Sequence, residues 1–198
     1  MTRFDVNAPP RHIVLALVFL MGLLASAALH ADPPGLDYLF PAGFARGTTT
    51  EKVTVGGATD PWPVKCRVDH DGIQITAEEE KGRLTVVVGP DVPVGVYFLR
   101  LSSDQGVSSP RPFLVGAVKE TSEVEPNNNG KQANLVEGPR AVNGRLGSSS
   151  DVDQFRVKVE AGQVLVASLL GNNVLASPMD AVLQICDQDG FILAQNDD

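Results

Sequence analysis

The sequence predicts an all-β fold: two tandem antiparallel β-sandwiches behind a signal peptide. Three observations support this class. The N-terminus carries a short apolar leader, apolar residues then alternate with polar ones along short runs, and Gly, Pro, Asn or Asp ends each run. Short alternating runs with a turn about every ten residues are typical of β-sandwiches. The hydrophobic fraction of 43% supplies enough material for a core.

Residues 1–31 have the layout of a signal peptide. Two arginines precede the apolar run Ile13–Leu24, and small residues follow it up to Ala31. We expect cleavage after Ala31 or, alternatively, after Ala27. The apolar run is shorter than the stretch of about 20 residues that spans a bilayer. An uncleaved membrane anchor is the alternative interpretation of this run. The rest of the chain is predicted to be secreted, periplasmic or at the cell surface, without further membrane contact.

Residues 38–118 are predicted to form the first sandwich, of immunoglobulin-like type. Its strands follow in the order "EKVTVGG", "PVKCRV", "IQITA", "RLTVVV", "VYFLRLSS" and "RPFLVGAV". Within the second of these, Val64, Cys66 and Val68 alternate with charged residues and should face the core. We find no apolar stripe with helical spacing in this region.

Residues 119–129 are polar and are expected to link the first sandwich to a second, incomplete one at 130–198. Beyond this linker, Phe155, Val157 and Val159 alternate with charged residues and should point inward. "QVLVASLL" is expected to form the next, apolar strand. A strand ending at the Asp-Gly turn and the start of another, "FILAQNDD", complete the pattern.

Charge separates the two halves. The region 38–118 carries 8 basic and 9 acidic residues, whereas 119–198 carries 6 basic and 12 acidic residues, a net charge of −6. The net charge of −8 argues against a nucleic-acid partner, which would need a basic face. Carboxylates and carbonyls on loops are the ligands that Ca²⁺ prefers, although solvated acidic loops have the same composition.

The stretch "EVEPNNNGKQANLV", followed by "VNGRL", "DVDQF", "AGQ", "SPMD", "DQDG" and "NDD", resembles the bacterial pre-peptidase C-terminal (PPC) domain. That resemblance implies a non-catalytic β-sandwich appended to secreted proteases and other exported proteins. The family is similar to the collagen-binding domains of clostridial collagenases, whose corresponding acidic segment binds calcium. It therefore implies a calcium site with the ligands Glu123, Glu125, Asn127, Asn128, Asp151 and Asp153. Family members often have Asp where this chain has Asn128, so we expect weaker binding.

The first module more loosely resembles immunoglobulin-like IPT/TIG domains, through "FPAGFARGTTTEKVTVGG" and "PVGVYFLRLSSDQGVSSPRPFLVG". The tandem resembles large exported proteins of environmental, planctomycete-like bacteria, in which such modules act as spacers or folding aids. The PPC pattern continues beyond "NDD", so we expect an incomplete second sandwich with an open apolar edge. The protein should be a monomer unless that edge pairs.

Nothing in the sequence predicts an enzyme. There is no G-x-S-x-G motif, and His70, the one histidine after the leader, falls in the turn "DHDG". Asp151 and Asp153 are two residues apart on a loop, a spacing more typical of a cation site than of a paired-carboxylate hydrolase. We therefore predict an accessory, spacer or binding module. The alternative is an N-terminal fragment of a larger secreted hydrolase, such as a protease.

Cysteines and aromatic residues complete the expectations. Cys66 and Cys186 fall in different predicted domains and are expected to be buried free thiols, although export permits a disulfide. Tyr38, Trp62 and Tyr97 are expected to be exposed and are candidates for contact with an unknown protein or polysaccharide ligand. For Trp62, a place in the core at the end of the sandwich is the preferred interpretation.

Overall fold

The computed structural model describes residues 32–197, so the predicted signal peptide lies outside the described residues. Strands dominate, which confirms the all-β class. The strands are β1 (Tyr38–Phe40), β2 (Gly43–Ala45), β3 (Thr49–Gly56), β4 (Lys65–Val68), β5 (Ile73–Ala77), β6 (Arg83–Val88), β7 (Gly95–Ser103), β8 (Gly106–Val107), β9 (Arg111–Gly116), β10 (Lys119–Ser122), β11 (Asn134–Val136), β12 (Arg140–Asn143), β13 (Phe155–Val157), β14 (Leu183–Cys186) and β15 (Ile192–Asn196). One short helix, α2 (Asn172–Leu175), is also described.

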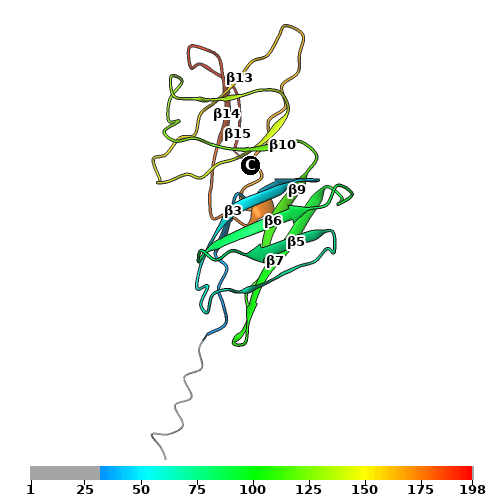
Figure 1. The fold of residues 1–198 in the computed structure, drawn as a ribbon. Helices are drawn as coiled ribbons and strands as arrows, with labels where there is room; N and C mark the ends of the chain where they lie inside the picture. The colour runs from blue at the N-terminus through cyan, green and yellow to red at the C-terminus, as the bar shows by residue number, and fades with distance from the viewer. Residues whose placement is uncertain (1–31, 198) are drawn as a thin grey trace, which may run out of the picture. The chain divides into compact units, whose positions relative to one another are not determined.

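Strands β1 to β9 form the sandwich that the alternating pattern predicts (Figure 1). One sheet has the order β1-β3-β6-β5, and the other has the order β2-β9-β7-β4, with β8 added beside β7. Pairing is antiparallel throughout except between β2 and β9, which run parallel. The predicted strands of this region therefore exist, with two short additions, β1 and β2, before them.

The inner faces of the two sheets make one hydrophobic core. Val53 and Leu84 from one sheet and Leu99 and Phe113 from the other are fully buried. Phe44 and Phe113 meet edge to face, with ring centroids 5.7 Å apart. Such edge-to-face pairs stabilise a core beyond their buried area. The predicted inward direction of Val64, Cys66 and Val68 is confirmed, because all three pack in or against this core.

The three aromatic residues that were candidates for ligand contact differ in burial. Trp62 packs against the core and donates a hydrogen bond from Nε1 to the carbonyl of Glu78 at 2.8 Å, which confirms the preferred interpretation. Tyr97 is buried, and its hydroxyl donates to the carbonyl of Pro93 at 2.7 Å, so its expected exposure is wrong. Its position in β7 explains this, since the residue alternates inward with Leu99. Tyr38 is partly exposed.

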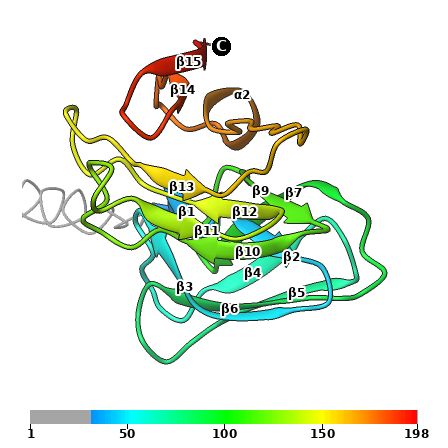
Figure 2. The ribbon, with the colours of Figure 1, turned by 90° about the horizontal axis from the view of Figure 1, so that it is seen from above.

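Parallel pairing dominates the segment after the sandwich, where antiparallel strands were expected (Figure 2). β10 pairs with β12, and β11 pairs with β13, both in parallel register. Among the described residues of this segment, β14 and β15 alone form an antiparallel hairpin. Lys119–Ser122, expected at the start of the linker, is thus a strand. The division into 38–118, 119–129 and 130–198 stays a prediction.

The later apolar residues do not build a second core. Each buried hydrophobic side chain among the described residues lies between Leu36 and Val115. Phe155, Val157 and Val159 are exposed, so their predicted inward direction is wrong. The expected strand "QVLVASLL" is absent from the described residues, and its Val164 is 87% exposed. A strand needs a partner for its backbone groups, and none is described beside this segment.

The cysteines are not bonded to each other. Cys66 is half-buried within β4, whereas Cys186 at the end of β14 is exposed, contrary to the expected burial. Burial raises the pKa of the Cys66 thiol to about 11. Among residues 32–197, no helix has the length and apolar character needed to span a bilayer.

Candidate metal site

The acidic segment that follows β10 is held in place by hydrogen bonds. The Glu123 amide donates to the carbonyl of Asn143 at 3.0 Å, directly beyond the β10–β12 pairing. The Asn134 side chain makes two hydrogen bonds to the backbone of Val124. Its Oδ1 accepts from the Val124 amide at 2.6 Å, and its Nδ2 donates to the Val124 carbonyl at 2.9 Å. A polar stretch that reads as a linker is therefore locally ordered.

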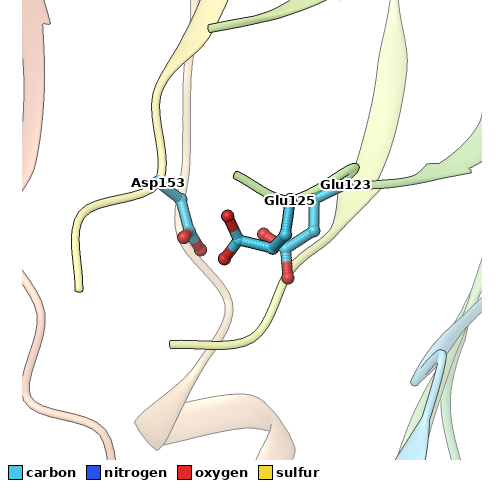
Figure 3. Close-up of side chains that lie close together, drawn as sticks. All are labelled: Glu123, Glu125 and Asp153. Carbon is cyan, nitrogen blue, oxygen red and sulfur yellow. The ribbon is translucent and has the colours of Figure 1, made fainter. Parts of the chain in front are cut away.

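Three carboxylates meet at this point. One carboxylate oxygen from each of Glu123, Glu125 and Asp153 lies within 4.8 Å of the others. Glu123 and Glu125 come from the segment after β10, and Asp153 comes from the loop before β13 (Figure 3). Because β11 pairs with β13, the fold brings the two loops together over 30 residues of sequence. Carboxylates this close repel one another unless a cation or a proton separates them.

Asn127 lies against the cluster and is completely buried. Its amide donates to Glu125 Oε2 at 2.9 Å, its Nδ2 donates to Glu123 Oε2 at 3.5 Å, and its carbonyl accepts from the Gln154 amide at 3.0 Å. Its Oδ1 is buried and has no hydrogen-bond partner, and the same holds for Asp153 Oδ1. A buried oxygen without a hydrogen-bond partner is costly, and Asn127 Oδ1 and Asp153 Oδ1 are therefore both free to accept from an electropositive group.

Gly144 permits the close packing of the cluster. A Cβ at this position would lie 2.9 Å from Glu123 Oε2 and 3.2 Å from Asp153 Oδ2. The next amide, that of Arg145, donates a short hydrogen bond to Glu123 Oε1. The loop after β12 therefore forms one wall of the site.

Burial, together with the neighbouring Asp153 carboxyl, raises the pKa of Glu123 to about 7, and the hydrogen bond from the Arg145 amide opposes this rise. A carboxyl whose charged form is destabilised in this way is relieved by a proton or by a cation. The same positively charged group would also give Asn127 Oδ1 and Asp153 Oδ1 a partner.

The donor set suits a hard cation. Carboxylates from Glu123, Glu125 and Asp153, together with the amide oxygen of Asn127, are oxygen ligands of the kind that Ca²⁺ takes. Of the remaining predicted ligands, Asn128 is exposed and makes no hydrogen bond among the described residues. Asp151 uses its carboxylate locally, accepting from the Gly147 amide at 2.6 Å and the Val152 amide at 3.0 Å.

The site is joined to the sandwich through the end of β12. Asn143 Oδ1 accepts hydrogen bonds from the amides of Ala42 at 3.2 Å and Gly43 at 2.9 Å, beside and within β2. Its Nδ2 donates to Glu120 Oε2 at 2.8 Å. One side chain thus ties β2, β10 and β12 together.

Arg145 makes a second connection. Its guanidinium carbon lies 5.1 Å from the ring centroid of Tyr38 and 5.6 Å from that of Phe40, both in β1. These are cation–π distances. Because the amide of the same residue binds Glu123, the acidic cluster and the sandwich share one short piece of chain.

Sequence reasoning identified the carboxylates but missed their supports. Asn134, Asn143, Gly144 and Arg145 hold the loops, and the stretches "EVEPNNNGKQANLV" and "VNGRL" that contain them were quoted only as parts of the motif resemblance. A glycine between two polar residues after a predicted strand was the available signal, since glycine allows close backbone approach.

No protein-family model and no curated protein sequence matches the chain, so the PPC resemblance stays a prediction. Among solved structures, the chain is similar to a Bacteroides ovatus protein, SGBP-B of a mixed-linkage glucan utilization locus, solved with a mixed-linkage heptasaccharide. That alignment has 18% identity and a TM-score of 0.34, covering 54% of this chain and 26% of that one. The chain thus spans about a quarter of that protein's length.

Two titin structures are also similar. A chimeric titin Z1Z2 shows 19% identity and a TM-score of 0.27, with 43% of this chain and 95% of that chain covered. Titin Z1Z2 in complex with telethonin shows 18% identity and a TM-score of 0.28, with 46% and 57% covered. Scores this low carry no argument about function.

Proposed function

We propose that the protein is an exported, non-catalytic β-sandwich module in which Ca²⁺ fastens the segment after β10 to the sandwich. The observation that carries this proposal is the buried, unpartnered Asn127 Oδ1 beside three carboxylate oxygens within 4.8 Å of one another. The export part rests on the leader sequence. The motif resemblance to the PPC domain supports the same ligand type.

The mechanism is physical. Without a cation, the Asp153 carboxyl destabilises the charged form of Glu123, which lies on the facing loop. Ca²⁺ removes that destabilisation and holds both loops to one point. The Arg145 amide donates to Glu123, and the Arg145 guanidinium lies over Tyr38 of the sandwich. A cation that fixes Glu123 therefore also fixes the position of Arg145 against the sandwich.

The stabilisation follows from mass action. A ligand that binds only the native state contributes about 2.7 kcal/mol at a concentration of 100 Kd. An accessory or spacer module gains a fixed geometry from this binding, without any chemical step of its own. The proposed ligands supply binding alone, and no residue is assigned a catalytic role.

Calorimetric titration of the metal-free protein with CaCl₂, paired with thermal unfolding, tests the proposal. We expect saturable binding and a rise in the unfolding temperature, both lost in Glu125→Gln and Asp153→Asn. Glu137→Gln is the matched control, because Glu137 is exposed in the same region and outside the cluster. Absence of Ca²⁺ binding, or equal binding by the cluster variants and the control, would refute the proposal.

A further inference from the structure

The outer face of the sandwich carries a basic patch at the edge where β4 pairs with β7. Lys65 and Arg67 of β4 and Phe98 and Arg100 of β7 alternate outward, whereas Leu99 between the last two is fully buried. In the antiparallel register, Arg67 lies directly opposite Arg100. We call Lys65, Arg67, Phe98 and Arg100 the arginine face.

The cations of this face have no carboxylate partners. The ion pairs found among the described residues join Lys81 to Asp60 and Arg83 to Glu80, at other places. Arg100 donates from Nη1 to the Ser108 carbonyl at 3.2 Å, which leaves its charge unneutralised. Like charges directly opposite each other in a sheet are destabilising. A pair of facing arginines in an acidic protein therefore calls for an anion.

The patch is also hollowed. A surface depression of about 460 Å³ is lined by Arg67, Val68, Asp69, Phe98, Arg100 and Pro110. Asp69 adds one carboxylate to the two guanidinium groups of this lining, which leaves a net charge of +1, and its Oδ1 accepts from the Phe98 amide at 3.0 Å. Phe98 is 42% exposed, so a large aromatic surface lies next to the two guanidinium groups.

We propose that the arginine face binds an anionic polysaccharide whose sugar units carry carboxylates. Guanidinium groups bind carboxylates through two parallel hydrogen bonds and desolvate more readily than ammonium groups. A pyranose ring offers an apolar C–H face to Phe98 while its carboxylate reaches Arg67 or Arg100. This inference names the ligand class of the proposed exported module and uses none of the proposed calcium ligands.

A flat sugar fits this site better than an acidic peptide. The depression lies on the face of the sheet, formed by side chains of two paired strands and the segments beside them. Extended peptides are bound mainly by adding a strand to a sheet edge through backbone hydrogen bonds. The residues of the arginine face instead offer exposed side chains on the face of the sheet.

Affinity electrophoresis of the purified protein through gels containing polygalacturonate tests the proposal. We expect retardation that weakens with added salt, because the contact is ionic. The double variant Arg67→Ser/Arg100→Ser should bind at least tenfold more weakly, and Phe98→Ala should also lose affinity. Arg46→Ser/Lys158→Ser removes the same charge from exposed residues elsewhere and should bind like the unmodified protein. Unchanged melting curves show that each variant is folded.

The inference would be overturned by no retardation in polygalacturonate, by equal retardation of the double variant, or by equal or stronger binding of poly-glutamate or of a neutral β-glucan. The measurement is repeated with chelator and with Glu125→Gln. Retardation that persists there keeps the polysaccharide site even if the calcium proposal fails. Retardation that disappears there would place the ligand at the acidic cluster and refute the arginine face as its site.

Discussion

Replacement of Asn143 by alanine tests how the segment after β10 is attached to the sandwich. The side chain accepts from the amides of Ala42 and Gly43 and donates to Glu120. At a net value of about 0.5–1.5 kcal/mol for each hydrogen bond, the loss amounts to about 2–4 kcal/mol. The upper part of this range applies because the Gly43 amide is buried and would be left without an acceptor.

Urea unfolding followed by Trp62 fluorescence gives the magnitude, and amide exchange gives the location. With a denaturant slope of about 2 kcal/mol per molar, the midpoint should fall by about 1–2 M. The Ala42 and Gly43 amides should lose protection, whereas Val86 in β6 should keep it relative to global unfolding. Asn172→Ala is the control, since Asn172 makes one exposed hydrogen bond to Ser177 and should change stability by less than about 0.5 kcal/mol.

Asn143→Asp separates the two halves of the interaction. It keeps the acceptor for both amides but removes the donor to Glu120, whose pKa is raised by burial. The new carboxylate then faces a second one, so the variant should be more destabilised at pH 8 than at pH 5. A loss below about 0.5 kcal/mol for Asn143→Ala, with unchanged protection of Gly43, would refute the assigned role.

Four further predictions concern other parts of the chain. Gly144→Ala should weaken Ca²⁺ binding at least tenfold, because its Cβ meets Glu123, whereas Gly95→Ala, with open space around it, should not; titration calorimetry checks both. Metal-free protein should lose stability as pH rises from about 4.5 through about 7, because the raised pKa of Glu123 favours the protonated folded form; melting curves of Glu123→Gln should lack this loss. Iodoacetamide at pH 8 should alkylate exposed Cys186 and spare Cys66, as peptide mass mapping would show. Phe113→Ala should cost about 3–5 kcal/mol in urea unfolding, and a cost below 1 kcal/mol would contradict its place in the core.

The sandwich could be predicted from the sequence because its strands bury one face. Ile73 and Ile75 alternate with exposed residues, and this period-two pattern specifies both strand and direction. Beyond Val115 the same reasoning failed, because Val157 and Val164 have the alternation or β-propensity of a strand without a surface to bury them. Local pattern indicates which face would be buried, whereas the presence of a covering layer depends on tertiary packing.

The sequence predicts the carboxylates of the candidate metal site but not the residues that support them. Carboxylates such as Glu123 and Asp153 are visible in sequence as ligand types, and the motif placed them together. Asn143 and Arg145 act through backbone geometry and long-range contacts, with Asn143 lying 100 residues from Gly43. No local pattern encodes a contact of that range. The carboxylates and their supports are connected through the parallel pairing of β10 with β12 and of β11 with β13.

The position of the core along the chain also sets an order of events during synthesis. Every buried hydrophobic side chain described precedes Lys119, so the chain delivers all the material of the sandwich core before the acidic segment. Domains generally fold from the N-terminus as they emerge. The later segment therefore docks on a sandwich that has already folded, where the amides of Ala42 and Gly43 are in place to donate to Asn143. Assembly of the molecule is in this sense directional, with the self-sufficient part first and the dependent part second.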